Sequence, residues 1–323
     1  MDVKVKTSLN DAARYRLPFG LVLLLRANFT MAAVIPAVTR LSNRIIRILG
    51  CNPGPMTLQG TNTYLIGTGK DRILLDTGDK DIKQYQKHLS EVVSAEKINI
   101  EHIVLTHWHH DHIGGVENIY GTIAKSPTIW KHKRHESDGV DKDLPASVPL
   151  KWLTDGQEIK VEGATLKIHH TPGHTTDHVV LTLIEDNILF SGDCILGEGT
   201  AVFEDLYTYM KSLQRILELK PGVIYPGHGN VVEDPLEKIK YYIEHRNMRE
   251  DQILNALKDN GNKHFNEMDL VKLIYRDTPE HLWAAAAYNV NHHLTKLTKE
   301  NKIECINING ENKWKIITGQ SNL

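Results

Sequence analysis

Cysteine is scarce in this chain of 323 residues, and the three that occur, Cys51, Cys194 and Cys305, are far apart. An odd number of scattered cysteines argues against a disulfide framework and favours a reducing compartment. Long hydrophobic runs are also lacking: the apolar stretch from Phe19 to Leu25 has seven residues, whereas a membrane-spanning helix needs about twenty. Strong charge of one sign is missing too, because 38 lysines and arginines nearly balance 40 aspartates and glutamates. The net charge of −2 therefore points neither to nucleic acid nor to a membrane surface.

Histidine is plentiful instead, with 18 residues, and the densest group lies in the stretch LTHWHHDHIGG at residues 105–115. Four candidate metal ligands fall within six residues there: His107, His109, Asp111 and His112. The apolar run just before them predicts a buried strand. A loop leaving a strand can point several side chains into one cleft, whereas a helix would spread them around its circumference. Imidazole and carboxylate groups favour zinc, with manganese or iron as alternatives. A histidine-rich surface loop is the competing interpretation, but a metal site predicts further ligands downstream.

Three further candidate ligands follow in the chain. They are His174 in the motif TPGH, Asp193 in FSGD and His228 in YPGHG. Each comes after a β-rich apolar run, so the order of strand, turn and ligand occurs four times. One metal ion takes about four ligands, so this larger set predicts two ions.

These ordered motifs resemble the metallo-β-lactamase superfamily over about residues 42–235, and the Asp76 of LLDTG matches the first motif of that superfamily. The resemblance implies that one metal is held by His107, His109 and His174, that the other is held by Asp111, His112 and His228, and that Asp193 bridges them. Asp76 is expected to orient a ligand or its loop. Some β-lactamases of this superfamily carry a cysteine where this chain has Asp193. An aspartate resembles the thioesterase and nuclease branches, so a lactamase function is not expected.

The chemistry expected of such a site is hydrolysis. Two adjacent divalent cations can lower the pKa of a shared water and supply hydroxide without a serine or cysteine nucleophile. Asp111 and Asp193 are therefore predicted as catalytic carboxylates as well as ligands. His178 is a weaker candidate, as a proton donor to the leaving group or, with more support, as a hydrogen-bond partner of a ligand. Thr61 and Asn62 are predicted to contact substrate, because the corresponding loop of the family overhangs the metal cleft; a simple turn is the alternative.

The alternation of strands and helices, together with the resemblance, predicts an α/β fold: an αβ/βα metallo-β-lactamase sandwich at residues 41–240. Residues 1–40 form an N-terminal extension. Its first 30 residues hold five lysines and arginines against two aspartates, which resembles an organelle-targeting presequence. An unstructured extension, or a start at Met31, is the alternative. Residues 124–150 are predicted to be a variable surface region.

Residues 241–323 are predicted to form a winged-helix-like domain. Helical spacing covers residues 250–257, 268–276 and 279–300, with Asn266 as a cap for the second helix. A hairpin over residues 303–317 turns at Asn309 and Gly310. Winged helices often contact nucleic acid, but many bind other proteins. Five lysines near the third helix and the wing would serve phosphate attraction or form a solvated face. They are Lys296, Lys299, Lys302, Lys313 and Lys315.

Two further runs are NPGPMTLQGTNTY at residues 52–64 and SGDCILGEGT at residues 191–200, and a tail pattern begins at His245-Arg246-Asn247. With these features, the chain from Met31 onward resembles more closely one branch of the superfamily, the mitochondrial endoribonucleases of the glyoxalase II-like subgroup. This resemblance implies cleavage of single-stranded RNA with two Zn²⁺ per chain, manganese being the alternative metal. It also implies the mitochondrial matrix, with the cytoplasm as the alternative location. The competing function is a glyoxalase II-like thioesterase that hydrolyses S-acyl thioesters with the same ligands. A metal-stabilised binding module is disfavoured by the complete ligand set. No membrane partner is expected, and the sequence leaves the oligomeric state open.

Overall fold

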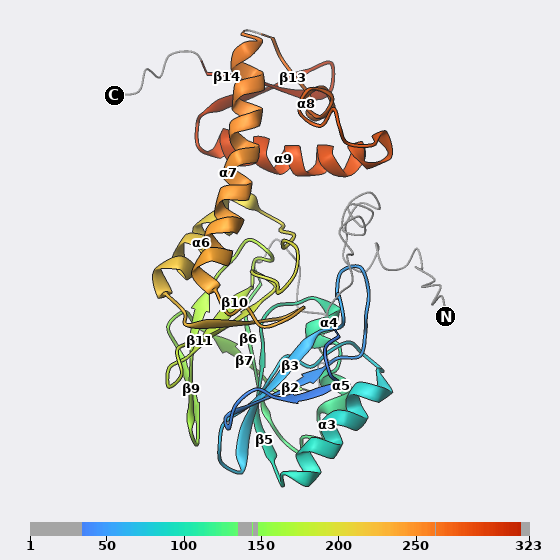
Figure 1. Cartoon of the computed structure of the whole chain (residues 1–323), viewed down its shortest axis with the longest axis vertical. Coiled ribbons are helices and arrows are strands. Elements are labelled where there is room, and N and C mark those ends of the chain that lie inside the picture. Colours follow the sequence, from blue (N-terminus) through green and yellow to red (C-terminus); the bar gives the residue numbers. More distant parts are fainter. Residues whose placement is uncertain (1–33, 135–143, 145–147, 262, 318–323) are drawn as a thin grey trace. The chain divides into compact units, whose positions relative to one another are not determined.

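The structure is a computed structural model that describes residues 34–134, 144, 148–261 and 263–317. The described residues form two compact units, the first ending at Tyr242 and the second beginning at Ile243 (Figure 1). Most of the predicted N-terminal extension lies outside the described residues. Within the described ranges, no helix has both the length and the apolar character needed to cross a membrane.

The first unit contains a seven-stranded mixed sheet ordered β1-β2-β3-β4-β5-β6-β7. Its strands are β1 (Val38–Arg40), β2 (Ile45–Leu49), β3 (Asn62–Ile66), β4 (Asp71–Leu75), β5 (Asn99–Leu105), β6 (Thr128–His132) and β7 (Leu150–Leu153). Strands β1 to β4 pair antiparallel, whereas β4 to β7 run parallel. The C-terminal ends of β4 and β5 therefore lie at the same edge of this sheet.

A second mixed sheet has five strands, ordered β12-β11-β10-β9-β8. Its strands are β8 (Glu158–Val161), β9 (Ala164–His170), β10 (Val179–Leu183), β11 (Ile188–Gly192) and β12 (Val223–Pro226). Strands β8 to β11 pair antiparallel, and β12 adds parallel to β11. Strands β9, β11 and β12 consequently end at a common edge.

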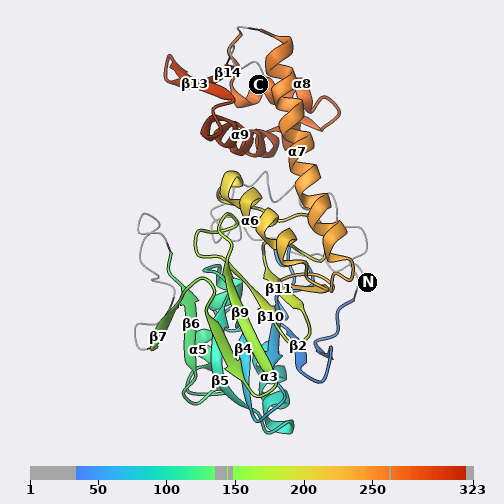
Figure 2. The same cartoon turned by 90° about the vertical axis from the view of Figure 1, so that its left-hand side faces the viewer.

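The two sheets enclose one apolar core and are flanked by helices (Figure 2). Alternate side chains of the buried strands point to opposite faces. On β3, Tyr64 and Ile66 pack between the sheets, and Leu65 packs on the other face. Helix α3 (Lys83–Ala95) buries Tyr85 and Leu89 in the cluster on that other face. This arrangement confirms the predicted sandwich.

Further helices lie in the first unit. The short helices α4 (His110–Ile113) and α5 (Val116–Ile119) follow β5. Helix α6 (Leu206–Leu219) is tied to the loops after β11 and β9, because Tyr209 Oη donates to the carbonyl oxygen of Cys194 and Ser212 Oγ to that of Pro172, each at 2.7 Å. These bonds fix the loops in which the later candidate ligands lie.

The second unit has the predicted winged-helix pattern. It contains part of α7 (Pro235–Asp259), then α8 (Glu267–Ile274), the 3₁₀ turn η2 (Glu280–Leu282), α9 (Trp283–Lys299) and the hairpin β13 (Ile303–Ile308) and β14 (Glu311–Ile316). Asn266 and Asp269 form a reciprocal capping box at the start of α8. Asn309 and Gly310 have φ of 53° and 86°, as a primed hairpin turn requires.

Two predictions about elements were incomplete, and residues 135–143 and 145–147 of the second lie outside the described residues. The helix predicted over residues 250–257 is the end of α7, which begins at Pro235, a residue well suited to a first helical position. Residues 124–150 are not only surface, because β6 lies within the first sheet and buries Ile129 and Lys131 completely. A lysine in a strand reads as exposed, so its burial could not be inferred from the sequence pattern.

Candidate metal centre

The candidate ligands lie in loops that leave the C-terminal ends of strands β5, β9, β11 and β12. The loop after β5 carries His107 and His109 and then turns into α4, which holds Asp111 and His112. The loops of the second sheet carry His174, Asp193 and His228. Since the strands of each sheet end at a common edge, these loops converge there. All seven side chains are buried and form two neighbouring groups.

The first group consists of His107, His109, His174 and Asp193. His107 Nε2 lies 2.9 Å from His109 Nδ1 and 3.2 Å from His174 Nε2. Asp193 Oδ2 lies 3.7 Å from His174 Nε2 and 4.0 Å from His107 Nε2. One oxygen and three nitrogens thus surround a common point, as the ligands of a tetrahedral site do.

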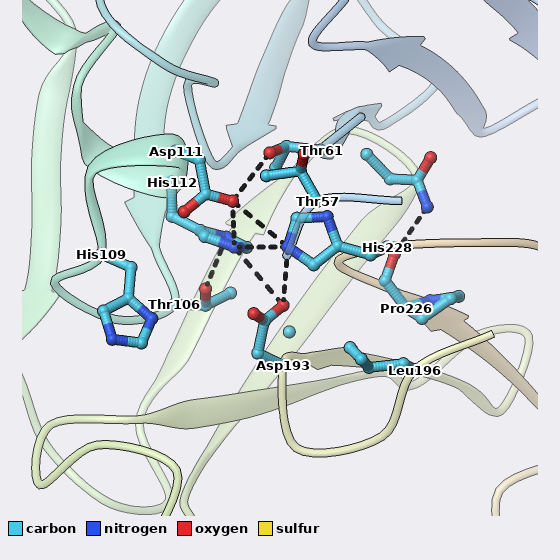
Figure 3. Close-up of polar contacts among 12 residues, drawn as sticks. Thr57, Thr61, Thr106, His109, Asp111, His112, Asp193, Leu196, Pro226 and His228 are labelled. Atoms are coloured by element: carbon cyan, nitrogen blue, oxygen red, sulfur yellow. Dashed lines mark hydrogen bonds and ion pairs between the residues drawn. The ribbon is translucent and has the colours of Figure 1, made fainter. Parts of the chain in front are cut away.

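The second group consists of Asp111, His112 and His228, and Asp193 turns its other oxygen toward it (Figure 3). Asp111 Oδ2 lies 3.3 Å from His112 Nε2 and 3.2 Å from His228 Nε2. Asp193 Oδ1 lies 3.4 Å from His112 Nε2 and 3.3 Å from His228 Nε2. Asp193 therefore presents one carboxylate oxygen to each group, which is the placement a bridging ligand needs.

Hydrogen bonds behind the imidazoles fix which nitrogen faces the centre. Thr106 Oγ1 donates its single proton to Asp76 Oδ2 at 2.9 Å, so it accepts from His107 Nδ1 at 3.0 Å. His174 Nδ1 donates to the carbonyl oxygen of Val202 at 2.8 Å. Burial lowers the pKa of His107 well below its ordinary value and also lowers the pKa of His174, so both rings are neutral. Two unprotonated Nε2 atoms thus lie 3.2 Å apart, an arrangement that fits a cation between them.

The charges in the second group also favour a bound cation. Burial favours the neutral form of His228, but the carboxylates of Asp193 and Asp111 outweigh it and raise the pKa of His228 to about 10. Burial would also raise the pKa of Asp193 and Asp111, yet the neighbouring imidazoles hold both pKa values well below the ordinary range. A divalent cation would take the place of the imidazole protons, so its binding would release protons. The two buried His/Asp groups therefore fit a dinuclear metal site.

Asp76 lies where the sequence predicted it, behind a ligand. Its Oδ2 accepts from His112 Nδ1 at 2.7 Å, and its Oδ1 accepts from the Thr106 amide at 2.8 Å. A carboxylate behind an imidazole fixes the orientation of the ring and raises its basicity. The residue has a left-handed backbone, with φ of 57°, a conformation that aspartate and asparagine adopt more often than most other non-glycine residues.

The predicted substrate contacts, Thr61 and Asn62, also lie behind ligands, with only 0% and 1% of their surface exposed. Thr61 Oγ1 donates to Asp111 Oδ2 at 2.9 Å. Asn62 Nδ2 donates to the carbonyl oxygens of Pro226 and Gly229, on both sides of His228. Buried hydrogen bonds of this kind hold ligands in place, so the expected contact with substrate gives way to a positioning role for both residues.

Comparison with known proteins identifies the family. The model of the metallo-beta-lactamase superfamily matches residues 56–228, more than half of the chain. The chain belongs to the metallo-β-lactamase superfamily. Its second unit is matched over residues 267–314 by the beta-lactamase associated winged helix domain.

Curated relatives of this metallo-β-lactamase protein cover most of its length. A beta-lactamase-like protein 2 homolog of Drosophila melanogaster is 58% identical over 84% of this chain and 93% of its own. A beta-lactamase-like protein 2 homolog of Caenorhabditis elegans is 47% identical over 84% of this chain and 89% of its own. An atrochrysone carboxyl ACP thioesterase of Claviceps purpurea is 39% identical over 76% of each chain.

Among solved structures, a beta-lactamase domain protein from Burkholderia ambifaria superposes with a TM-score of 0.73 at 18% identity, covering 91% of this chain and 98% of its own. A metallo-beta-lactamase family protein from Thermus thermophilus superposes with a TM-score of 0.63 at 19% identity, covering 88% of this chain and 100% of its own. These likenesses establish the fold. With the two buried His/Asp groups, the family identifies the protein as a metallo-hydrolase.

His178, the weak catalytic candidate of this metallo-hydrolase, lies behind Asp193. Its Nε2 accepts from the Asp193 amide at 3.1 Å, and its Nδ1 lies 3.0 Å from Thr171 Oγ1. Burial holds the pKa of His178 well below its ordinary value, so the ring is neutral, and the side chain is fully buried. This placement favours the alternative role, in which His178 positions a ligand loop.

Thr106 is a positioning residue that the sequence analysis missed. Its hydroxyl joins Asp76 to His107, and its side chain is buried. The available signal was its place, directly between the end of β5 and the first ligand. A threonine there is also an ordinary strand residue, so the sequence pattern alone does not separate the two roles.

Proposed function

We propose that the protein is a zinc-dependent endoribonuclease that cleaves single-stranded RNA internally. The observation that carries the hydrolytic part is the position of Asp193, with one carboxylate oxygen facing each group of ligands. Five histidines and two aspartates form a donor set that suits zinc, and the carboxylates leave manganese as the alternative metal. The RNA substrate is supported by the likeness of the sequence to the endoribonuclease branch and by the attached winged helix.

The residues of this chain would hold and orient the reacting groups. His107, His109 and His174 would hold one metal, and Asp111, His112 and His228 the other. Asp193 would bind both. When bound, two divalent cations supply hydroxide at neutral pH and stabilise charge that develops on the scissile group. Thr61, Asn62, Asp76 and His178 hold the ligands at fixed positions through the hydrogen bonds described above. No serine or cysteine nucleophile is required.

The charge of the winged helix gives the RNA proposal less support than the sequence suggested. Lys302 Nζ lies 3.0 Å from Glu250 Oε1 and 2.8 Å from Glu300 Oε2. Lys315 Nζ lies 2.9 Å from Glu304 Oε1. Lys296 is buried between Glu250 and Glu300. The carboxylates beside these three lysines weaken the phosphate attraction expected of them, so further cationic contacts would strengthen the case for RNA.

A thioesterase is the second candidate function. The curated thioesterase relative from Claviceps purpurea, at 39% identity, favours it. The metals that these residues would hold could supply hydroxide to a thioester carbonyl carbon as well as to a phosphorus atom. The ligands do not separate the two reactions, so the groups around the centre must select the substrate.

The proposed location is the mitochondrial matrix, with the cytoplasm as the alternative. Three scattered cysteines without a disulfide among the described residues fit either reducing compartment. Fusing residues 1–30 to a fluorescent protein tests the targeting role directly. Import into the matrix supports the proposal, and diffuse cytoplasmic fluorescence contradicts it.

The deciding experiment supplies the purified full-length protein, with its metal content determined, with labelled single-stranded RNA and with S-lactoylglutathione. We expect internal RNA cleavage that a chelator abolishes and that zinc or manganese restores. Asp193→Asn is the control, since it should lose hydrolysis while retaining the fold. Thioester hydrolysis without RNA cleavage would instead establish the second candidate.

A further inference from the structure

The opening of the metal centre can be located from the exposure of its side chains. His109 and Asp193 are each 8% exposed, whereas the other five ligands are at most 3% exposed. A substrate must therefore approach beside these two residues. The ring of Trp108, 7% exposed, packs edge-on against His109 with 4.7 Å between the ring centroids. Trp108 is thus part of the same border of the site.

A positively charged side chain also lies on this border. Arg134, just beyond the end of β6, stacks its guanidinium on the indole of Trp108, with Cζ 4.3 Å from the ring centroid. The stack passes from Arg134 through Trp108 to the ligand His109. An aromatic face holds a guanidinium by cation–π attraction and keeps its plane in one orientation.

Both partners of the stack carry hydrogen-bond donors that meet no acceptor among the described residues. These donors are Arg134 Nε and Trp108 Nε1, and both atoms are buried. No described carboxylate forms an ion pair with Arg134, unlike Arg44, which reaches Asp186, and Arg215, which reaches Asp155. A buried donor without an acceptor is unfavourable, so this pair of side chains is suited to a ligand that brings oxygens and negative charge.

We propose that Arg134, oriented by Trp108, binds a backbone phosphate of the RNA strand next to the phosphate that is cleaved. This inference rests on the proposed ribonuclease function and names a substrate contact for it. Guanidinium groups bind phosphate through paired N–H donors, and loss of the hydration shell is less unfavourable for them than for an ammonium group. The contact supplies a further cationic group beside the centre, in addition to the winged-helix lysines. The contact should affect RNA but not a small phosphodiester, since a small phosphodiester has no neighbouring phosphate for Arg134 to bind.

The test measures KM and kcat of the metal-loaded full-length protein and its Arg134→Gln variant. The substrates are single-stranded RNA and bis(p-nitrophenyl) phosphate, a diester with one phosphate. We expect the KM for RNA to rise about tenfold in R134Q, as loss of one charged hydrogen-bonded contact predicts. The kcat for RNA and both constants for the small diester should stay within about twofold. The dependence of log KM on log salt concentration should also become shallower by about one, the contribution of a single phosphate contact.

Two further variants control the test. Arg134→Lys keeps the charge but loses the planar stack, so its KM for RNA should lie between those of R134Q and the unmodified protein. Lys151→Gln removes a cation stacked on another tryptophan, Trp130, with Nζ 5.1 Å from the ring centroid, and should leave every constant unchanged.

The outcomes are distinct. An R134Q variant with an unchanged KM for RNA would overturn the phosphate contact and leave the ribonuclease standing. An equal loss with RNA and with the small diester would also overturn it, because Arg134 would then act through the shape of the site. Absence of RNA cleavage by the unmodified protein would overturn the proposed function, and this inference with it.

Discussion

At the scale of single residues, the hydroxyl of Thr61 supports the second group of ligands. It donates to Asp111 Oδ2 at 2.9 Å, and the Thr61 side chain is fully buried. Thr61→Val keeps the shape but removes this donor, so Asp111 is held less firmly. We expect the weaker-bound metal to lose about 10- to 100-fold in affinity, the usual effect of removing a partner behind a ligand. Chelator competition with the purified protein measures this change.

Thr63→Val is the matched control for that prediction. Thr63 lies two residues further along β3, is equally buried, and donates to the carbonyl oxygen of Ile48 at 2.8 Å, away from the ligands. Each variant loses the buried hydrogen bond that its hydroxyl donates, and T61V also loses the bond that Thr61 Oγ1 accepts from Asn52 Nδ2. Only T61V should weaken metal binding. Equal affinities for T61V and the unmodified protein would show that Thr61 does not support the site.

These residues also show which parts of the site could be predicted from the sequence. The seven candidate ligands could be picked out because histidine and aspartate that repeatedly follow strands are typical of a metal site, and the structure brings them into two neighbouring groups. Thr61 and Asn62 could be found but not given the right role, since a polar residue in a turn looks the same whether it points inward or outward. The contact proposed for Arg134 had no signal in the sequence, because it depends on the stacking of Arg134 on Trp108.

At the scale of elements, a buried ion pair joins the two sheets. Lys131 on β6 and Asp177 in the loop after β9 are both fully buried, with Nζ 2.6 Å from Oδ2. Thr175 Oγ1 donates to the other oxygen of Asp177 at 2.7 Å. Because His174 and His178 lie in the same loop, the pair helps to fix that loop against the first sheet.

Breaking this pair should destabilise the first unit. Lys131→Met leaves a buried carboxylate uncompensated, and Asp177→Asn leaves a buried ammonium group. Each change should lower the free energy of unfolding by about 3–5 kcal/mol, and the double variant by less than the sum of the two. Urea unfolding of the three variants measures the coupling. Lys160→Met, which breaks an exposed pair with Glu158, should leave the midpoint unchanged.

The packing of α9 in the second unit predicts a dependence on pH. Burial, and then the positive charge of Arg246, hold the pKa of His293 well below its ordinary value; Lys296, Arg249 and His292 act in the same direction. Below about pH 6.5, His293 therefore binds a proton in the unfolded chain but stays neutral in the folded unit. The contribution of neutral His293 to the free energy of unfolding is fully present above about pH 6.5. It is lost as the pH falls below that value.

His293→Gln should remove this part of the pH dependence. Below about pH 6.5, the difference in unfolding free energy between the unmodified protein and the variant should change by up to about 1.4 kcal/mol per pH unit. Thermal unfolding at several pH values between 7.5 and 5 measures it. His281→Gln, at an exposed position, is the control and should keep the original pH dependence. The same slope in H293Q would mean that His293 is not the titrating group.

Element boundaries were the weaker part of the sequence analysis, for physical reasons. The capped helix α8 and the hairpin at Asn309 carry local signals, and both were predicted. The helix α7 was found only in part, because its first half is mostly polar and its apolar residues, such as Ile239 and Tyr242, are few. Strand β6 was missed because Lys131 interrupts its apolar pattern. The burial of Lys131 is explained only by its ion pair with Asp177, which is distant in the sequence.

At the scale of the whole molecule, the metal centre and the winged helix belong to different compact units. The first unit holds every candidate ligand, and the second holds an apolar core of its own, built around residues such as Leu257, Val290 and Trp314. Tyr242, at the boundary, belongs with the first unit, because its Oη accepts from the Leu196 amide and lies 3.1 Å from the Gly199 carbonyl oxygen. A deletion that tests the second unit must therefore keep Tyr242.

We predict that deleting residues 243–323 weakens the use of RNA more than the use of a small phosphodiester. The ligands and the residues behind them all remain, so turnover of bis(p-nitrophenyl) phosphate and the metal content should be retained. The KM for RNA should rise, because a long strand loses the contacts that the winged helix contributes to binding. Steady-state kinetics with both substrates measures the difference, and metal analysis confirms that the shortened chain is loaded. If both substrates lose activity to the same extent, the winged helix supports the fold of the enzyme, and RNA is held entirely by the first unit.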